Sequence, residues 1–309
     1  MASTTSLLLK KTRSHVPVLN AVLGIAEARF DQLKINQGKI LTRLNRSLGS
    51  KNLQDYEFKV FSQWGEDGII QKLISLVPIE NRTFIEFGVE DFNEANCRFL
   101  MAHNHWRGFV LDGSARWIEK LRSADWLWKY DLRAEQAMVT RDNVNELLSR
   151  SGYDRDLGIL SIDVDGIDYW LLEAVTAFEP RIIIMEYNAL FGRDRAVTVP
   201  YDASFSRRAK HYSELYFGAS LAALEHLAGR KGYALVCTES AGVNAFFVRN
   251  DLLGGDVQAL SASAAYSATH VRQSRNHEGA LDYLDPGAQY DAIRGMPVVN
   301  VITGALETL

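Results

Sequence analysis

From residue 83 onward the chain alternates short apolar runs with segments of helical spacing, and this alternation restricts the fold more than any other feature. The runs begin with "TFIEFGV" (83–89) and "RGFVLDGS" (107–114), and a weaker one is expected near Trp126–Tyr130. The strongest two are "LGILSID" (157–163) and "PRIIIMEY" (180–187), whose apolar residues are almost continuous. Continuous apolar strands are typical of parallel sheets that helices cover on both faces. The sequence therefore predicts a doubly wound α/β fold.

Two further strands complete the predicted sheet. The helix "GASLAALEHLAGRKG" ends near Gly232, and "YALVCT" and "NAFFVR" then face each other across "ESAGV" as an antiparallel hairpin. Five parallel strands, a helix and a hairpin predict a mostly parallel seven-stranded sheet whose last strand is antiparallel, the arrangement of class I methyltransferases. We expect this α/β domain to span residues 51–250, with residues 251–309 as an irregular extension packed on it.

The first fifty residues form a segment of their own, with apolar positions at steps that alternate four and three. The positions are Leu19, Leu23, Ala26, Phe30, Leu33, Gln37, Ile40 and Leu44, of which Gln37 is the polar member. This heptad rhythm predicts either a seam that faces a partner helix, and hence a homo-oligomer, or an amphipathic helix on its own domain. The stretch "RSLGSKN" ends the helix, with Gly49 as the predicted C-cap.

Charge is distributed unevenly along the chain, although the net charge is only −4. Residues 1–50 carry eight basic and two acidic side chains, a net charge of +6, so the remainder carries −10. The negative total argues against general nucleic-acid binding, whereas the basic leader fits either peripheral contact with a membrane surface or plain solvation. Its start, "MASTTSLLLKKTRSH", also has the composition of a transit peptide. Isolated cysteines, Cys97 and Cys237, and the lack of an apolar run of about 20 residues favour a cytoplasmic protein.

Acidic residues follow four of the predicted strands at the point where each strand ends. They are Glu86 with Gly88, Asp112 with Gly113, Asp163 with Asp165, and Glu186 with Asn188. Ligands of open α/β sheets bind at the carboxyl ends of the strands. The sequence therefore predicts a binding site along this edge, lined by carboxylates.

The loop after the first strand, "EFGVEDF", favours one kind of cofactor over another. It has one glycine, Gly88, where a dinucleotide fingerprint has three, and its acids would repel a diphosphate. A sulfonium cofactor with an amino group and a ribose diol is a better electrostatic match. Asp112 at the end of the second strand is suited to a pair of ribose hydroxyls, because a carboxylate accepts two hydrogen bonds in one plane. The alternative is that Gly88 and the Asp112-Gly113 pair are ordinary turn residues.

The acids after the fourth and fifth strands predict a metal site. Asp163 and Asp165 lie two positions apart, and Glu186 and Asn188 repeat that spacing. Converging acids ionise comfortably only around a cation, and an oxygen-rich set of this kind suits Mg²⁺. Such a cation would lower the pKa of a substrate hydroxyl. Asp168 is predicted to cap the following helix instead.

Two other stretches add candidate residues to the site. His211 follows the fifth strand after a long loop and is a candidate general base, and Asp165 is a second candidate for the proton. Nearby Arg207, Arg208 and Lys210 would suit an anionic acceptor or be solvated. "FSQWGEDGII" places Gln63 and Trp64 before a helix, where they could line the site, and we include Gln63 and Gly113 among the cofactor contacts.

Seven stretches together resemble a known family. They are "FSQWGEDGII", "FIEFGVEDFNEANCRFL", "LSIDVDGIDYW", "PRIIIMEYNA", "YFGASLAALEHL", "VNAFFVR" and "SRNHEG", within roughly residues 57–305. The set is similar to FkbM-type proteins, a branch of the class I S-adenosylmethionine-dependent methyltransferases. Such proteins tend to have Asp-Val-Glu-Gly after the fourth strand, where this chain has Asp163-Val164-Asp165-Gly166.

The resemblance implies S-adenosylmethionine contacts at Glu86, Gly88 and Asp112. It also implies a divalent metal at Asp163 and Glu186, with Asn188 where related sugar O-methyltransferases have an acid. The expected function is methylation of a sugar hydroxyl in a polysaccharide or glycosylated metabolite. The rival reading is a non-catalytic assembly protein that keeps the fold and oligomerises through its N-terminal helix. A nucleotide-sugar enzyme is disfavoured because the first loop has too few glycines for a phosphate.

Overall fold

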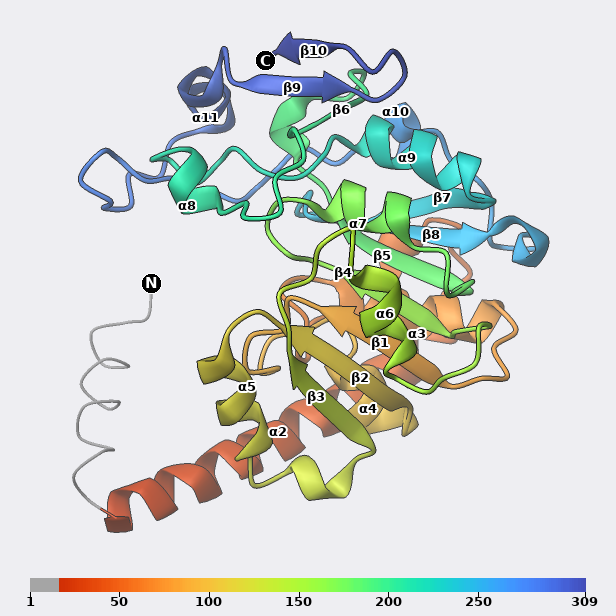
Figure 1. Cartoon of the computed structure of the whole chain (residues 1–309). Helices are drawn as coiled ribbons and strands as arrows, with labels where there is room; N and C mark the ends of the chain where they lie inside the picture. Colours follow the sequence, from red (N-terminus) through yellow and green to blue (C-terminus); the bar gives the residue numbers. More distant parts are fainter. Residues whose placement is uncertain (1–16) are drawn as a thin grey trace.

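A seven-stranded sheet organises the molecule (Figure 1). The computed structural model describes residues 17–309, and the side chains from residue 29 onward. The strands of the sheet are β1 Thr83–Phe87, β2 Arg107–Asp112, β3 Leu132–Gln136, β4 Ile159–Ile162, β5 Ile182–Glu186, β7 Tyr233–Thr238 and β8 Asn244–Arg249. Their order is β3-β2-β1-β4-β5-β8-β7, and β8 runs antiparallel to both of its neighbours. The predicted fold class, with its antiparallel last strand, is confirmed.

The third strand lies later than the sequence predicted. Trp126–Tyr130 is not a strand, because Leu127–Lys129 forms a 3-10 turn and β3 starts at Leu132. The Trp126 ring packs near Phe92 and Tyr130, so these aromatic residues cover the sheet instead of joining it. The strand itself alternates buried and exposed residues, as an edge strand does, and lacks the continuous apolar run that marks β4 and β5.

Helices cover both faces of the sheet. One face carries α3 Glu66–Leu76, α4 Arg98–Asn104 and α5 Ala115–Arg122, and the other carries α6 Val144–Ser149, α7 Asp168–Ala174 and α9 Leu221–Arg230. Alternate residues of each strand feed the two layers. In β1, for example, Phe84 packs with the α3 layer and Ile85 with the α6 layer.

The helix α2, Pro17–Asn45, lies on α3 and α4 and presents an apolar seam to solvent. It docks through Ile35 and Gly38, and a Cβ at Gly38 would approach the Phe99 ring to 2.5 Å. The predicted seam is the opposite face, on which Phe30, Leu33, Ile40 and Leu44 are each more than half exposed. The helix therefore rests on its own domain and leaves the seam open. It ends at Asn45, so Gly49 is not its C-cap.

The last sixty residues are more regular than predicted. They contain α10 Ala262–Ala265, α11 Pro286–Ile293, β9 Pro297–Asn300 and β10 Leu306–Thr308. A two-residue strand in the long loop after β5, β6 Val197–Thr198, pairs with β9 to give a second sheet of order β10-β9-β6. The same loop contains the short helix α8, Arg207–Lys210. The C-terminal residues thus brace the loop that carries α8.

The start of the basic leader, residues 1–16, includes the stretch with the composition of a transit peptide and lies outside the described part of the chain. No helix in the described part combines the length and the hydropathy that a membrane-spanning segment requires.

Candidate functional site

The ends of the four central strands meet in one row. The register pairs Phe87 with Leu111 and Ile162, and Ile162 with Met185. The next position along each strand is Gly88, Asp112, Asp163 or Glu186. The structure therefore brings the predicted residues to a single edge of the sheet, as expected for parallel strands.

Three carboxylates form a tight cluster on this edge. Single oxygens of Asp163, Asp165 and Glu186 all lie within 4.8 Å of one another. Glu186 is buried, Asp163 is half-buried and Asp165 is exposed. Burial and then mutual repulsion raise the pKa of both Asp163 and Glu186 well above the ordinary range. The cluster thus favours either a bound cation or a shared proton.

The cluster fits a cation better than a protein-only network. Among the described residues, none donates a hydrogen bond to the carboxylate of Asp163, and the buried Oε2 of Glu186 has no partner. Buried polar atoms are ordinarily satisfied, so an orphaned oxygen in an acidic cluster needs an explanation. An oxygen-only ligand set with carboxylates from β4 and β5 would hold a hard divalent cation such as Mg²⁺.

Arg207 is a cationic side chain that lies beside the acid cluster. Its guanidinium pairs with Asp165, donates from Nε to the carbonyl of Glu214 at 3.0 Å and lies 3.7 Å from the Phe217 ring centroid. Burial alone would lower the pKa of Arg207, but the carboxylates of Asp165 and Glu186 raise it. The sequence placed Arg207 near an anionic acceptor, whereas here it offsets the acids. Nothing in the sequence links it to Asp165, 42 positions away.

Asn188 and His211 point their polar groups elsewhere. The Asn188 amide donates to the carbonyls of Leu215 and Phe217 at 2.9 and 3.0 Å, and its oxygen accepts from Leu190. It fastens the loop that leads to α9. The imidazole of His211 contacts Ser213 Oγ at 2.7 Å. Burial and then His277 lower the pKa of His211, so its neutral form is favoured.

Glu86 is buried on the α4 side of the sheet. Its oxygens accept from the backbone N–H groups of Asn96 and Cys97 at 2.8 and 3.1 Å, just before α4. Burial raises the pKa of Glu86 to about 7, although these hydrogen bonds oppose the rise. Its carboxylate fastens the segment that leads into α4.

Asp112 joins the first loop to the second strand. It accepts from the N–H of Glu90 at 2.8 Å and from that of Ser114 at 2.7 Å, one hydrogen bond on each oxygen. It is half-buried, and an ionised carboxylate keeps further lone pairs for a ligand. Gly113 follows it, with the Met138 side chain as its nearest neighbour.

The backbone conformation and packing of the first loop require a glycine at Gly88. At Gly88, φ is +76°, and a Cβ would lie 1.5 Å from the carbonyl oxygen of Asp163. The ends of β1 and β4 are therefore in backbone contact. The loops beside this contact contain non-glycine residues in the left-handed region, Glu90, Phe92 and Asp165, with φ between 47° and 59°. Such conformations concentrate at functional sites.

Two residues flagged in the sequence have other places. Asp168 is the first residue of α7, not its cap, and its carboxylate accepts from the N–H groups of Val164 and Gly166. It therefore shapes the loop that holds the acid cluster. Gln63 is exposed, in a segment whose Phe61 carbonyl accepts from Ala95, beside the loop after β1.

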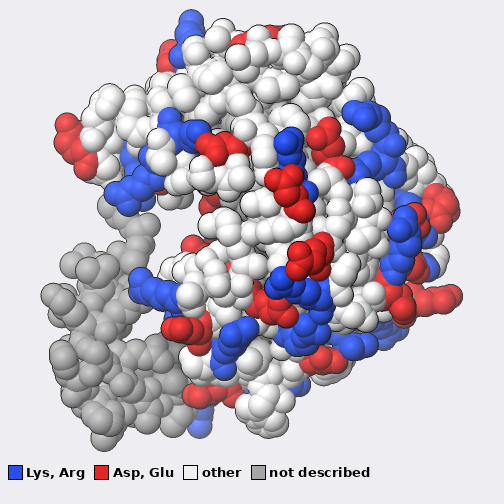
Figure 2. Space-filling view, viewed as in Figure 1, with Lys and Arg blue, Asp and Glu red and all other residues white. Residues whose placement is uncertain are grey.

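Figure 2 shows the outline indented on the left, between the lobe that carries α8 and the lobe that carries α5, with acidic atoms in its wall. The strand order and antiparallel β8 are those of the class I methyltransferase fold, as the sequence predicted.

No family model and no curated protein matches the chain. Among solved structures, it is similar to an S-adenosylmethionine-dependent methyltransferase from Clostridium acetobutylicum, with 9% identity and a TM-score of 0.39 over 67% of this chain and 94% of that one. A putative RNA methyltransferase from Pyrococcus horikoshii has 10% identity and a TM-score of 0.36 over 69% and 96%. The N-terminal domain of EvdMO1 with SAH bound has 10% identity and a TM-score of 0.35 over 54% and 72%. These likenesses are too remote to support a statement about this chain, whose fold class follows from its own strand order.

Proposed function

We propose that the protein is an S-adenosylmethionine-dependent O-methyltransferase, most closely allied to the FkbM-type branch. The observation that carries the proposal is the row of Gly88, Asp112, Asp163 and Glu186 along the carboxyl edge of a sheet with class I methyltransferase order. Ligands of such sheets bind at this edge, and the carboxylates there suit a cofactor that carries a positive charge.

The residues present fit the cofactor. Asp112 would accept from ribose hydroxyls, and Glu90 in the first loop would favour a sulfonium or an ammonium group. When bound, S-adenosylmethionine would supply an activated methyl group. The chain would supply orientation, which by itself accounts for a large part of the rate of such transfers.

The acid cluster has two uses in this reaction. Asp163 and Glu186 would hold a divalent cation that orients the acceptor hydroxyl, and Asp165 would receive its proton. Arg207 restrains Asp165 and so sets which carboxylate faces the acceptor. We propose a sugar hydroxyl as the acceptor, following the resemblance to sugar O-methyltransferases.

Calorimetric titration with S-adenosylmethionine and its demethylated product tests the proposal. We expect micromolar binding by the intact protein and loss of binding in Asp112→Ala. The matched control is Asp154→Ala, since Asp154 is exposed and precedes β4, at the amino end of that strand and not at the acidic edge. Thermal unfolding of both variants verifies that they are folded. Absence of binding by the intact protein would refute the proposal.

Metal binding is tested separately, by titration with Mg²⁺ and by the electron paramagnetic resonance signal of Mn²⁺. We expect the intact protein to bind either ion and Glu186→Gln to bind neither, because the variant removes a charge from the cluster. Glu119→Gln, at an exposed position of α5, should bind as the intact protein does. Equal binding by Glu186→Gln would place the ion elsewhere.

The exposed seam of α2 favours a second candidate function, assembly through a second copy of the chain. The seam keeps its heptad spacing across Phe30, Leu33, Gln37, Ile40 and Leu44 while another face of the helix docks on the domain. Basic residues flank it, including Lys34 and Arg43, so salt should strengthen the association by screening.

Light scattering with the double variant Leu33→Gln/Ile40→Gln tests this candidate. We expect the intact chain to show a higher mass than the variant, and the difference to grow with salt. A monomeric intact chain at all salt concentrations would rule out assembly through α2.

A further inference from the structure

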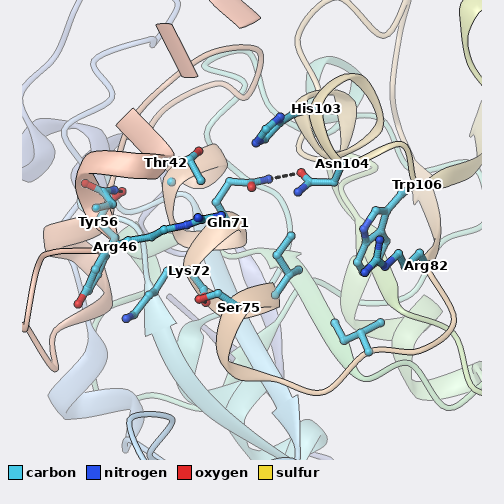
Figure 3. Close-up of a pocket in the computed structure, with 14 residues that line it drawn as sticks. Thr42, Arg46, Tyr56, Gln71, Lys72, Ser75, Arg82, His103, Asn104 and Trp106 are labelled. Atoms are coloured by element: carbon cyan, nitrogen blue, oxygen red, sulfur yellow. Dashed lines mark hydrogen bonds between the residues drawn. The ribbon is translucent and has the colours of Figure 1, made fainter. Parts of the chain in front are cut away.

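A cavity of about 440 Å³ lies at the edge of the sheet opposite the acid cluster (Figure 3). Arg82 and Trp106, which line it, directly precede β1 and β2, so the cavity opens at the amino ends of these strands. Residues of α2, α3 and α4 form the remaining walls. The cavity and the acidic edge lie at opposite ends of β1, a strand that rises about 3.3 Å per residue.

The lining of this cavity is basic. It includes Arg46 from the turn after α2, Lys72 of α3 and Arg82, and it includes no aspartate or glutamate. Within the described residues, none of these three cations forms an ion pair. Lys72 Nζ lies 4.4 Å from the centroid of the Tyr56 ring, which holds the ammonium group in place. Three uncompensated cations around one hollow produce a positive potential that attracts anions.

His103 supplies an independent observation. Its Nδ1 is buried and has no hydrogen-bond partner in the described part of the chain. Burial and then the nearby Lys39 lower the pKa of His103, and Arg43 and Arg46 contribute further. A solvated basic surface would explain the cations, but it would explain neither the hollow between them nor the unpartnered imidazole nitrogen.

Hydrogen-bond donors also converge on the cavity. Gln71 Nε2 donates to Asn104 Oδ1 at 2.7 Å, as Figure 3 shows. The amide nitrogen of Asn104 donates to no described residue and is left for a ligand. A free donor beside the cations suits the oxygen-rich surface of a phosphate group.

We propose that this cavity binds a phosphate-bearing anion, held by Arg46, Lys72 and Arg82. Its volume lies within the usual range for small-molecule sites, so it admits a phosphorylated molecule and not only a bare ion. The ligand could be a free phosphorylated metabolite or the headgroup of an anionic lipid, because the chemistry of recognition is the same. The site does not depend on the methyl transfer proposed above.

Calorimetry with inorganic pyrophosphate tests the site directly. We expect binding that weakens with salt, and at least tenfold weaker binding by the double variant Lys72→Gln/Arg82→Gln. The matched control is Arg230→Gln/Arg294→Gln, which removes the same charge from exposed positions elsewhere and should bind normally. Binding should also raise the pKa of His103 in a nuclear magnetic resonance titration, because the anion offsets the surrounding cations.

A flotation assay with phosphatidylglycerol and phosphatidylcholine vesicles separates the two sources. Pyrophosphate binding without flotation identifies a free phosphorylated ligand. Flotation with phosphatidylglycerol vesicles alone, lost in the cavity variant, identifies a lipid headgroup. The proposal is overturned if the intact protein binds neither pyrophosphate nor anionic vesicles, or if the cavity and control variants behave alike.

Discussion

At the scale of single residues, the buried and half-buried carboxylates fall into two groups that the sequence does not distinguish. Asp67 accepts hydrogen bonds from three successive backbone N–H groups, and Glu239 accepts from those of Ala241, Val243 and Asn244. These acids, like Asp168, organise loops. Asp163 and Glu186 have no such donors in the described residues, and this lack distinguishes them from the acids that organise loops.

Glu86 makes the stability of the protein depend on pH. Burial raises its pKa to about 7 from an ordinary value of 4.5, so between these values the folded state binds more protons than the unfolded state. Its contribution to the free energy of unfolding therefore falls as pH rises from about 4.5 to 7. We expect the stability of Glu86→Gln, relative to the intact protein, to increase from pH 5 to pH 8 in urea unfolding. A constant difference across that range would contradict the assignment.

Gly88 tests the contact between β1 and β4. In Gly88→Ala the new methyl group would collide with the Asp163 carbonyl, and the residue would also have to keep a φ of +76°. We expect a loss of about 3–5 kcal/mol in the free energy of unfolding. The control is Gly152→Ala, where φ is +68° but nothing lies within 4 Å, so only about 1–2 kcal/mol should be lost. Equal losses would show that the contact is unimportant.

At the scale of elements, α2 shows how one helix serves two environments. Its inward face carries Asp31, Ile35 and Gly38, and its outward face carries the apolar seam. Sequence periodicity identified only the outward face, because the inward face is narrow and contains a glycine and an aspartate. The structure explains both residues, because Gly38 lies against the Phe99 ring and Asp31 pairs with Arg98.

The ion pair between Asp31 and Arg98 is expected to hold α2 on the domain. Arg98 Nη2 lies 2.7 Å from Asp31 Oδ2, and the guanidinium is almost fully buried over the Phe61 ring. Removing one partner leaves a buried charge, so Asp31→Asn should cost about 1–3 kcal/mol, less than a fully buried pair because Asp31 is partly exposed. Limited proteolysis should cut α2 faster in this variant and not in Asp142→Asn, whose aspartate is exposed. Unchanged proteolysis would contradict the assigned role.

At the scale of the whole molecule, two sheets cooperate to complete the site. The large sheet supplies the carboxylates, whereas the small sheet β10-β9-β6 braces the segment that brings Arg207 to them. Val298 of β9 is fully buried against that segment's apolar residues. The C-terminal strands β9 and β10 are therefore coupled, through this segment, to the ion pair between Arg207 and Asp165.

Deleting residues 295–309 should uncouple the two sheets. The truncated protein would lose β9 and β10, leave β6 paired only with the segment around Ala219 and expose apolar residues such as Val197. We expect a lower Tm and faster amide hydrogen exchange across residues 197–217, with the exchange of β1 and β4 nearly unchanged. Slow exchange in 197–217 after truncation would show that the loop is held by the large sheet alone.

The sequence alone determined the sheet and the row of residues at its edge. Apolar runs predict strands, and the carboxyl ends of parallel strands lie at the same edge of a sheet, so Gly88, Asp112, Asp163 and Glu186 were expected along that edge. The sequence placed β3 too early in the chain, because this edge strand has no continuous apolar run.

Only the tertiary structure decided how those residues are used. Arg207 reaches Asp165 across 42 positions, Asn188 donates to the carbonyls of Leu215 and Phe217, and three cations surround a cavity at the opposite edge. Such contacts depend on the packing of distant loops, and no local periodicity encodes which side chains those loops bring together.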